Sequence, residues 1–333
     1  MKRLIITAPR QAAFEDVDLP RCSSNGVVVR AMVTAISTGT ELRVFRAIPV
    51  DEAGKFLHER VPFQFPMENG YSMVGEVVEV GADVTKVTTG DRVFARAPHK
   101  QFAAVDETMV TPLPRTIPDD EAVMLSILEV AHKALRQGNP PVGGNVAIVG
   151  QGVVGLSLTA YVSAFGLRTA VLDTQPFRLE VAKQIGARLA TTPGDEASRQ
   201  IIELFDNDGA DVSFEAASNW NGIRAAMELT RTDGKVVIVS RHTDDPDFNP
   251  VGHPFLGKRL NILTTYGYPS DDHRWSYRRS VDLTVDLLAE QRLNVRPMLT
   301  HRFSWEELPE VYRRMDEDDA SILSAVIDWG DEE

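Results

Sequence analysis

The stretch Val146-Ala-Ile-Val-Gly150-Gln-Gly152-Val-Val-Gly155 decides the fold, because an apolar run enters a G-x-G-x-x-G turn and continues into the apolar residues 156–165. This order predicts a strand, a tight turn and a helix. Gly150 would permit the sharp turn, Gly152 would let the backbone approach a pyrophosphate, and Gly155 would let the helix pack on the strand. The helix N-terminus would then face the phosphates with free N–H groups. We therefore expect a dinucleotide site here.

A second apolar run, Thr169-Ala-Val-Leu-Asp173, supports this interpretation, since a glycine turn alone is a weak signal. Its carboxylate lies 173 − 152 = 21 residues after Gly152, which is the spacing of the acid that binds the adenosine ribose. A 2′-phosphate at about 4 Å would be repelled there by about 1–4 kcal/mol, which favours NAD over NADP. Two alternatives stay open: Asp173 could cap the helix beginning near Pro176, and Arg178 could pair with a 2′-phosphate.

The composition is that of a soluble globular protein with 333 residues, 43% hydrophobic and 25% charged, which is long enough for two domains. A net charge of −13 argues against nucleic-acid binding. The single cysteine, Cys22, excludes an intrachain disulfide and a multi-cysteine zinc site. No apolar run approaches the ~20 residues that span a bilayer. The sequence before Pro9 lacks a signal-peptide core. We expect a cytoplasmic protein without a membrane partner.

The pattern of apolar, glycine and proline residues changes along the chain. Residues 1–118 are β-branched runs separated by glycine and proline, which predicts a small, partly closed β-barrel. Residues 47–66 have no clear period and suit either a binding loop or an ordered surface loop. Residues 119–267 alternate strands and helices, which predicts an α/β fold with a doubly wound, parallel, six-stranded sheet. We expect residues 268–333 to complete the first domain, with the active site in the cleft between the domains.

Further motifs follow one another in order: Ile36-Ser-Thr-Gly-Thr-Glu-Leu42, Gly70-Tyr-Ser-Met-Val-Gly-Glu-Val-Val-Glu-Val-Gly81, Gly90-Asp-Arg-Val-Phe94 and Gly209-Ala-Asp-Val-Ser-Phe-Glu-Ala216. With the glycine turn, this ordered set resembles the medium-chain dehydrogenase/reductases over nearly the whole chain. The resemblance implies a GroES-like catalytic domain (1–118 and 268–333) and a Rossmann domain (119–267). It also implies hydride transfer with a nicotinamide cofactor, a small-molecule substrate and a homo-oligomer, often a dimer.

The chain departs from the zinc-dependent members of that family at their metal ligands. Thr38 stands where they carry a cysteine, and Gly70-Tyr71-Ser72 stands where they carry Gly-His-Glu. The third ligand position falls near 126–129, where there is no cysteine, and the cysteine-rich structural lobe is missing. Catalytic zinc needs three protein ligands of Cys, His, Asp or Glu type. We predict that neither catalytic nor structural zinc is bound.

A metal-free enzyme must polarise the substrate oxygen with hydrogen-bond donors and supply the proton from a side chain or water. Tyr71, at the vacated ligand position, is the best candidate for general acid or base, and a neighbouring cation would have to lower its pKa from ~10. Thr38 and His132 are further catalytic candidates. Each has a structural alternative: a wall residue for Tyr71, a turn residue for Thr38 and a packed helical histidine for His132.

Motif position places the remaining candidates. At the cofactor we expect Gly150, Gly152, Val153, Val154, Gly155, Asp173, Arg178, Ala216, Ser240 and Tyr266. As substrate contacts we consider Thr40, Glu41, Tyr268, Arg274 and Trp275. Glu41 could instead be the buried partner of an arginine, and the loop 269–276 could be an exposed domain connection.

The short motifs at 37–41 and 70–71 resemble the zinc-less branch that includes the bacteriochlorophyllide dehydrogenases. That resemblance implies NAD-dependent interconversion of a secondary alcohol and a ketone. A reductase of activated C=C bonds in enones or quinones is an alternative, which a saturated product with an intact carbonyl would reveal. A non-catalytic dinucleotide-binding protein is a third possibility.

Overall fold

The computed structural model describes residues 1–48, 55–56, 61–62, 64–242, 244–265, 275–317, 319 and 321–330. They form two compact units, Met1–Ser126 with Leu299–Glu333, and Ile127–Met298. The second unit extends beyond residue 267, where we expected the dinucleotide domain to end. The helix α9 (Tyr277–Ala289), which we expected in the first domain, is therefore part of the second unit.

The first unit is built mainly of antiparallel strands. Its three-stranded sheet has the order β2-β1-β6 and contains β1 (Lys2–Ala8), β2 (Gln11–Asp16) and β6 (Met67–Glu68). Its seven-stranded sheet contains β3 (Gly26–Ala35), β7 (Met73–Val80), β8 (Arg92–Ala95), β9 (Phe102–Asp106), β10 (Val110–Pro112), β17 (His301–Ser304) and β18 (Ala325–Asp328). The order is β10-β8-β7-β3-β18-β17, and β9 also pairs with β3. Strand β18 pairs antiparallel with β3, so the C-terminal segment completes this sheet.

Short elements surround these sheets. They are α1 (Thr40–Arg46), β4 (Lys55–Phe56), β5 (Val61–Pro62), η1 (Glu107–Met109), α2 (Asp119–Ala122), η3 (Trp305–Glu307) and α10 (Leu308–Asp316). Helices α1 and α10 pack against each other. Their apolar side chains Phe45 and Tyr312 are buried in the same core as Val27 and Val29 of β3. This packing brings both helices to the side of the unit that carries the candidate catalytic residues.

The second unit contains a six-stranded parallel sheet. Its strands are β11 (Asn145–Val149), β12 (Arg168–Leu172), β13 (Leu189–Thr191), β14 (Ala210–Glu215), β15 (Thr230–Ile238) and β16 (Asn261–Thr264). The order is β13-β12-β11-β14-β15-β16, and every neighbouring pair is parallel. The expected doubly wound Rossmann sheet is confirmed. Val146, Ala147 and Ile148 of β11 are fully buried, as strands covered on both faces must be.

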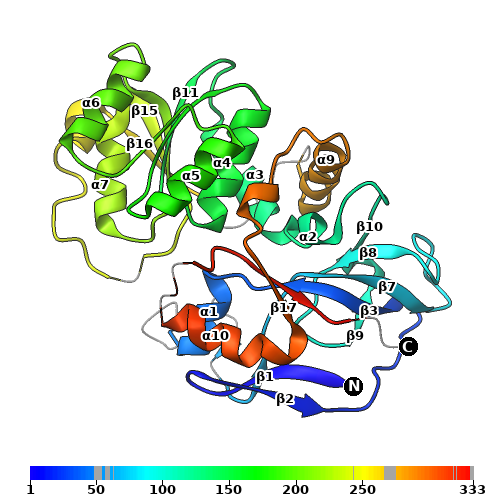
Figure 1. The fold of residues 1–333 in the computed structure, drawn as a ribbon. Coiled ribbons are helices and arrows are strands. Elements are labelled where there is room, and N and C mark those ends of the chain that lie inside the picture. The colour runs from blue at the N-terminus through cyan, green and yellow to red at the C-terminus, as the bar shows by residue number, and fades with distance from the viewer. Residues whose placement is uncertain are drawn as a thin grey trace. The chain divides into compact units, whose positions relative to one another are not determined.

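Helices cover both faces of this sheet (Figure 1). They are α3 (Leu125–Gly138), α4 (Val153–Ala164), α5 (Pro176–Ile185), α6 (Asp195–Leu204), α7 (Trp220–Leu229) and α8 (Phe255–Lys258). The unit also contains α9, which contacts α3 and α4 through Ser280 and Thr284, and the short turn η2 (Arg296–Met298). Helix α4 packs with α5 on one face, and α6 packs with α7 on the other. Strand order reverses at β11, which has β12 on one side and β14 on the other. Ligands of such sheets bind outside the carboxyl ends of the strands at this reversal.

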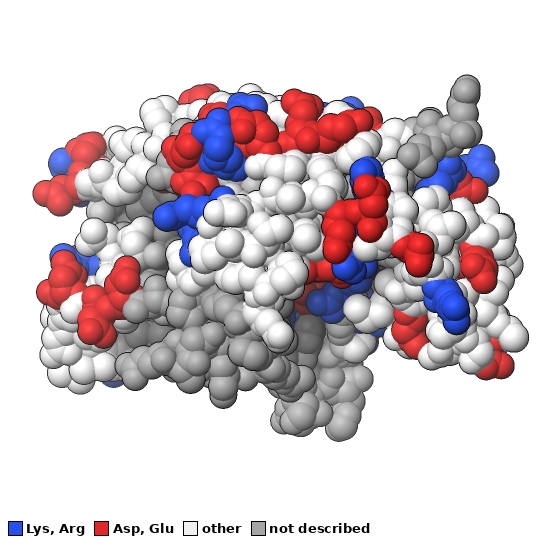
Figure 2. Space-filling model, turned by 90° about the horizontal axis from the view of Figure 1, so that it is seen from below, with Lys and Arg blue, Asp and Glu red and all other residues white. Residues whose placement is uncertain are grey.

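The surface carries mixed charge. On the face shown in Figure 2, Lys and Arg side chains lie scattered among Asp and Glu, and the described residues form no continuous basic area there. Among the helices that the structure describes, none is both long and apolar enough to cross a membrane.

Candidate active site

The glycine turn between β11 and α4 has the geometry that a pyrophosphate needs. Gly150 has φ +92°, and a Cβ added to it would lie 2.6–2.8 Å from the backbone of Ala216 and Ala217. A Cβ on Gly155 would lie 1.9 Å from the carbonyl oxygen of Gly150. A Cβ on Gly152, in contrast, would meet no described atom within 4 Å. The first two contacts require glycine, and the open backbone at Gly152 fits a dinucleotide phosphate at the N-terminus of α4.

Asp173 lies directly after β12 with its carboxylate fixed beside this turn. Its Oδ2 accepts a hydrogen bond from the amide of Gln151 at 2.6 Å, and its Oδ1 accepts one from the amide of Gln175 at 2.8 Å. Nη1 of Arg178 lies 3.9 Å from Oδ2. Asp173 thus binds the backbone of the turn before α5 and does not cap that helix, because its N-cap residue is Gln175 and no side chain caps it. Each carboxylate oxygen keeps a further lone pair, so the residue also fits a ribose diol.

The other expected cofactor residues lie at the carboxyl ends of β14 and β15 or at the start of α4. The amide of Ala216 donates to Val149, which joins the ends of β14 and β11. Ser240 follows β15, and its hydroxyl donates to Glu215 at 2.5 Å. Val153 and Val154 form the first turn of α4. Tyr266 lies outside the described residues.

Tyr71 has its phenol hydrogen-bonded and protonated. The hydroxyl donates to Oγ of Ser37 at 2.5 Å. Burial, and then the charge of Glu41, raise the pKa of Tyr71 to about 12, while the hydroxyls of Ser37 and Thr40 lower it by less. Arg96 is the cation that lowers this pKa, but its influence is smaller than those of burial, Glu41 and the two hydroxyls. The lowered pKa that efficient acid–base work near neutrality would require is therefore not found, and Tyr71 stays protonated, as a proton donor, near pH 7.

Glu41 is a buried carboxylate that binds the backbone at Ser37, the partner of Tyr71. Its carboxylate is fully buried and accepts hydrogen bonds from the Tyr312 hydroxyl and, at 2.9 Å, from the Ser37 amide. Nε2 of His99 lies 2.9 Å from the same carboxylate, and Nδ1 of His99 lies 2.8 Å from Oγ1 of Thr34. The structure therefore shows histidine and tyrosine partners instead of the expected arginine. An enclosed carboxylate does not suit the substrate contact that we considered, but it does fix the backbone of Ser37.

Thr38 and Thr40 are both half-buried; Thr38 lies in the turn before α1, as its structural alternative predicted, and Thr40 is the first residue of that helix. Ser72, next to Tyr71, is buried, and its hydroxyl has no hydrogen-bond partner among the described residues. Hydroxyl side chains thus stand at all three residues that we compared with the metal-binding motifs, Thr38, Tyr71 and Ser72. Such groups are not the usual ligands of zinc. Within the described residues, no three His, Cys, Asp or Glu side chains are placed to hold a metal ion, and the donors present do not fit zinc.

His132 packs between α3 and α9 inside the second unit. Only 2% of it is exposed, and Nδ1 lies 3.0 Å from Oγ of Ser280. Burial, and then the charge of Arg136, lower the pKa of His132 to about 4. The ring is therefore neutral near pH 7 and holds no transferable proton, which supports the structural alternative.

Trp275 is half-buried beside His132, with the two ring centroids 5.2 Å apart. The guanidinium groups of Arg136 and Arg279 lie 4.4 and 4.5 Å from the Trp275 ring centroid. Tyr268 and Arg274, our other candidates in this segment, lie outside the described residues.

The candidate residues chosen from the sequence did not include two polar side chains near the carboxyl ends of β14 and β15, Glu215 and His242, although Glu215 lies in the motif 209–216. Glu215 is fully buried at the end of β14, and Oε2 accepts a hydrogen bond from Nε2 of His242 at 2.8 Å. Glu215 ends the apolar strand β14, which was a usable signal, whereas His242 lies four residues after β15 and no motif points to it.

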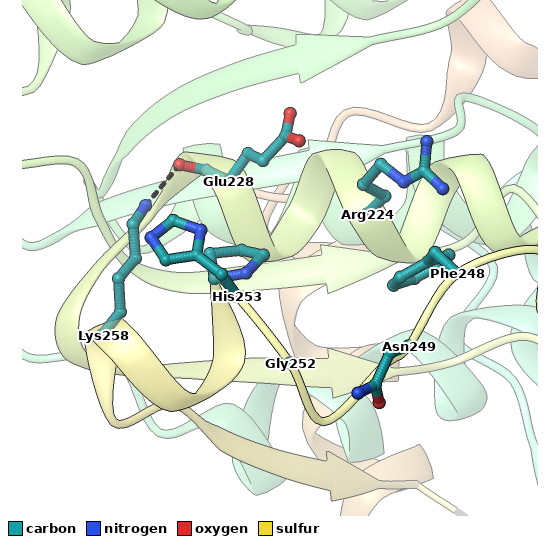
Figure 3. A pocket seen from close by; sticks show the side chains of 8 residues that line it. Arg224, Glu228, Phe248, Asn249, Gly252, His253 and Lys258 are labelled. Carbon is teal, nitrogen blue, oxygen red and sulfur yellow. Dashed lines mark hydrogen bonds between the residues drawn. The ribbon is translucent and has the colours of Figure 1, made fainter.

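The second unit also contains a pocket of about 460 Å³, drawn in Figure 3. It is lined by Arg224, Glu228, Phe248, Asn249, Gly252, His253, Pro254 and Lys258. Nζ of Lys258 donates to the carbonyl oxygen of Glu228 at 2.6 Å, the bond that Figure 3 marks, and to that of Thr230 at 2.8 Å. The Arg224 guanidinium stacks 4.4 Å from the Phe248 ring. Both cations are thus engaged, and no residue of the glycine turn lines this pocket.

Comparisons with known proteins agree with this arrangement. A family model described as alcohol dehydrogenase GroES-like domain matches residues 23–114, and one described as zinc-binding dehydrogenase matches residues 153–283. Sorbitol dehydrogenase of Bacillus subtilis (strain 168) is 25% identical over 94% of this chain and 93% of that protein. D-guloside 3-dehydrogenase of Escherichia coli (strain K12) is 25% identical over 94% and 95%.

The crystal structure of 2R,3R-butanediol dehydrogenase from Bacillus subtilis superposes with a TM-score of 0.81, covering 99% of both chains at 20% identity. The fold, the ordered motifs and these matches lead to one conclusion: the chain belongs to the medium-chain dehydrogenase/reductase superfamily, with the zinc-type alcohol dehydrogenase-like proteins, and is an oxidoreductase.

Proposed function

We propose that the chain is a zinc-independent, NAD(H)-dependent oxidoreductase that interconverts a secondary alcohol and a ketone, in the zinc-less branch of its superfamily. The observation that carries the proposal is Tyr71, whose phenol stays protonated and is fixed by Ser37 at 2.5 Å. It stands where zinc-dependent relatives have a metal ligand. A hydrogen-bond donor at that place replaces the metal as the group that polarises the substrate oxygen.

The proton transfer follows from these contacts. A nicotinamide cofactor held at the glycine turn would supply the hydride for ketone reduction, or accept it in alcohol oxidation. In ketone reduction the oxygen gains negative charge. The Tyr71 hydroxyl, which donates to Ser37 in the free protein, would turn its single hydrogen to this oxygen, give it a hydrogen bond and then the proton. The Ser37 hydroxyl, 2.5 Å from the phenol oxygen, can then donate a hydrogen bond to the tyrosinate until a proton from solvent restores the phenol. Buried Glu41 accepts a hydrogen bond from the Ser37 amide at 2.9 Å and so keeps the Ser37 hydroxyl within hydrogen-bonding distance of Tyr71.

The preference for NAD rests on Asp173. Members of this superfamily bind NAD(P), and the glycine turn fits a dinucleotide. The carboxylate of Asp173, held by the amides of Gln151 and Gln175, places a negative charge beside the turn. A 2′-phosphate would meet this charge, whereas a ribose diol can donate to it.

The substrate class that we propose is a polyhydroxy compound with a secondary hydroxyl group. The names of the relatives support this: they include sorbitol dehydrogenase and D-guloside 3-dehydrogenase. Alcohol–ketone chemistry is common to these names. The structure adds a cluster of hydroxyl side chains, Ser37, Thr38 and Thr40, next to Tyr71, which suits a substrate with several hydroxyl groups.

The test is an activity assay on purified full-length protein, with metal analysis of the same sample. Sorbitol, other polyols, sugar glycosides and 2,3-butanediol are each offered with NAD⁺ or NADP⁺, and the reduced cofactor is followed by absorbance. We expect NADH formation with a polyol-type substrate, no stoichiometric zinc and no loss of rate after chelation. Bound zinc, or inactivation by a chelator, would contradict the proposal. Turnover only with enones or quinones would favour the C=C reductase instead.

The proposal includes a cytoplasmic homodimer. Support for the dimer comes from β16, which forms one edge of the six-stranded sheet. Among the described strands it pairs with β15 alone, and Ile262 within it is 40% exposed. Uncovered edge strands of this kind are ready to pair with another chain.

A further inference from the structure

Glu215 is the centre of a polar cluster at the carboxyl end of β14. It is fully buried and accepts four hydrogen bonds. Oε1 accepts from the amides of Ala217 and Ser218 at 2.7 and 2.8 Å. Oε2 accepts from the Ser240 hydroxyl at 2.5 Å and from Nε2 of His242 at 2.8 Å. A carboxylate with four donors is satisfied as an anion, because only the ionised form accepts at both oxygens without donating.

This cluster fixes the orientation of the His242 ring. Since Glu215 acts only as an acceptor, Nε2 of His242 must carry the hydrogen, and Nδ1 is then the nitrogen with the free lone pair in the neutral ring. Ser240 accepts from the amide of Ser218 at 3.1 Å, so its own hydrogen is directed to Glu215. The Trp220 ring lies 5.5 Å from the His242 ring, centroid to centroid. Nδ1 makes no hydrogen bond to any residue that the structure describes.

The cluster lies on the side of β11 opposite to Asp173. The amides of Val239 and Ser240 donate to the carbonyl oxygen of Glu215 at 2.9 and 3.3 Å, which ties the end of β15 to the end of β14. The order β12-β11-β14-β15 places Asp173 on one side of the glycine turn and these residues on the other. A dinucleotide with its adenosine ribose at Asp173 and its pyrophosphate at Gly152 therefore extends its second half over β14 and β15.

We propose that His242 binds the nicotinamide ribose of the cofactor, with Nδ1 accepting a hydrogen bond from a ribose hydroxyl. Glu215 and Ser240 are positioning residues that hold the ring in this orientation. The inference rests on the proposed function, because it requires a dinucleotide at the glycine turn. It assigns this chain a contact that no G-x-G-x-x-G motif predicts, made by a residue four positions after the end of β15.

Three ligands of increasing length test this contact by binding alone. ADP carries the adenosine ribose and the pyrophosphate, ADP-ribose adds the second ribose, and NADH adds the nicotinamide. Dissociation constants are measured on the full chain by calorimetry for ADP and ADP-ribose, and by fluorescence for NADH. For His242→Ala we expect unchanged ADP binding and about tenfold weaker binding of both ADP-ribose and NADH. His253→Ala, in the pocket of Figure 3, is the matched control and should leave all three constants unchanged.

A second variant separates the contact from the stability of the cluster. His242→Gln keeps an N–H near the position of Nε2 for Glu215 but removes Nδ1. We expect it to melt at the wild-type temperature and still to lose affinity for ADP-ribose and NADH. Equal loss for all three ligands, loss for NADH alone, or no loss in either variant would overturn the assignment to the ribose. A wild-type protein that binds neither ADP nor NADH would overturn the proposed function together with this inference.

Discussion

Tyr71 is the residue on which our proposed chemistry depends. Replacing it with phenylalanine removes one hydroxyl, and we expect kcat for ketone reduction to fall by about 10²-fold, the usual contribution of a general acid. The dissociation constant for NADH should not change, because Asp173 and the glycine turn belong to the other unit. Steady-state kinetics and NADH titration measure both quantities. The control is Tyr161→Phe, the same chemical change at a buried tyrosine that hydrogen-bonds Thr284.

The same residue makes a prediction for pH. Because the pKa of Tyr71 is raised to about 12, the phenol stays protonated across the working range. The pH profile of kcat for reduction should therefore show no decline between pH 7 and about pH 10 that is caused by Tyr71. Any decline in that interval should also be present in Tyr71→Phe. A decline in that interval that is present in the wild type and missing in Tyr71→Phe would contradict this. It would mean that substrate binding lowers the pKa of Tyr71 below its value in the free protein.

Asp173 decides the choice of cofactor in our proposal. Asp173→Asn removes the charge but keeps an oxygen for one of the amides of Gln151 and Gln175. We expect the ratio of the dissociation constants for NADPH and NADH to fall by about tenfold, since about 1–4 kcal/mol of repulsion is removed. Asp195→Asn, the same change at the exposed start of α6, is the control and should leave the ratio unchanged. An unchanged ratio in Asp173→Asn would show that another group excludes the phosphate.

For single residues, the sequence predicted where a residue lies along a strand or turn better than which side chains it contacts. The glycine turn and Asp173 lie where the motif put them, because local backbone chemistry sets both. The partners of Glu41, which are His99 and Tyr312, come from distant parts of the chain, and no local pattern encodes that contact. The raised pKa of Tyr71 escaped prediction for the same reason, since burial and Glu41 cause it. Contacts of this kind depend on the complete fold.

Among the elements, the parallel strands were predicted well and the short helices poorly. Long apolar runs identify buried strands such as β11 and β14 whatever surrounds them. Helix α1 was not predicted, because seven residues with a weak periodic pattern form a helix only through the tertiary burial of Leu42 and Phe45. Over 295–303 the structure has a short helical turn around Pro297 before β17 begins at His301. Proline lacks the N–H that a strand ladder requires.

The contact between α3 and α9 makes stability depend on pH. His132 has a pKa of about 4 in the folded protein against 6.5 for an unperturbed histidine. Above pH 6.5 neither state is protonated, so the residue has no effect. As the pH falls from 6.5 towards 4, only the unfolded chain takes up the proton, and the free energy of unfolding decreases. The loss due to this group is about 2 kcal/mol at pH 5.

His132→Asn should remove this part of the acid sensitivity. The measurement is urea unfolding of both proteins at pH 7 and pH 5, compared as the change in the free energy of unfolding between the two pH values. The wild type should lose about 2 kcal/mol more than the variant. His253→Asn, at an exposed histidine of the same unit, should behave like the wild type. Identical changes in wild type and His132→Asn would show that the ring does not stay neutral in the folded state.

At the scale of the whole molecule, the edge of the parallel sheet predicts how the chain assembles. Strand β16 ends the sheet, and Ile262 within it is 40% exposed. Pairing of two such edges across a twofold axis would extend the hydrogen-bond ladder and cover this side chain in both copies. A lysine at an edge strand blocks such pairing. We therefore expect Ile262→Lys to convert the proposed dimer into a monomer.

Light scattering coupled to gel filtration gives the mass of both proteins. The wild type should elute with twice the mass of the chain and Ile262→Lys with the mass of one chain. NADH affinity should stay the same, because the carboxyl ends of β11 and β12 do not include this edge. Val142→Lys adds the same charge at a fully exposed position and should remain dimeric. If Ile262→Lys also remains dimeric, the interface lies elsewhere on the molecule. The exposed edge of β16 must then be protected from pairing with another chain by its short length and by the polar residues Asn261 and Thr264, which flank its two apolar residues.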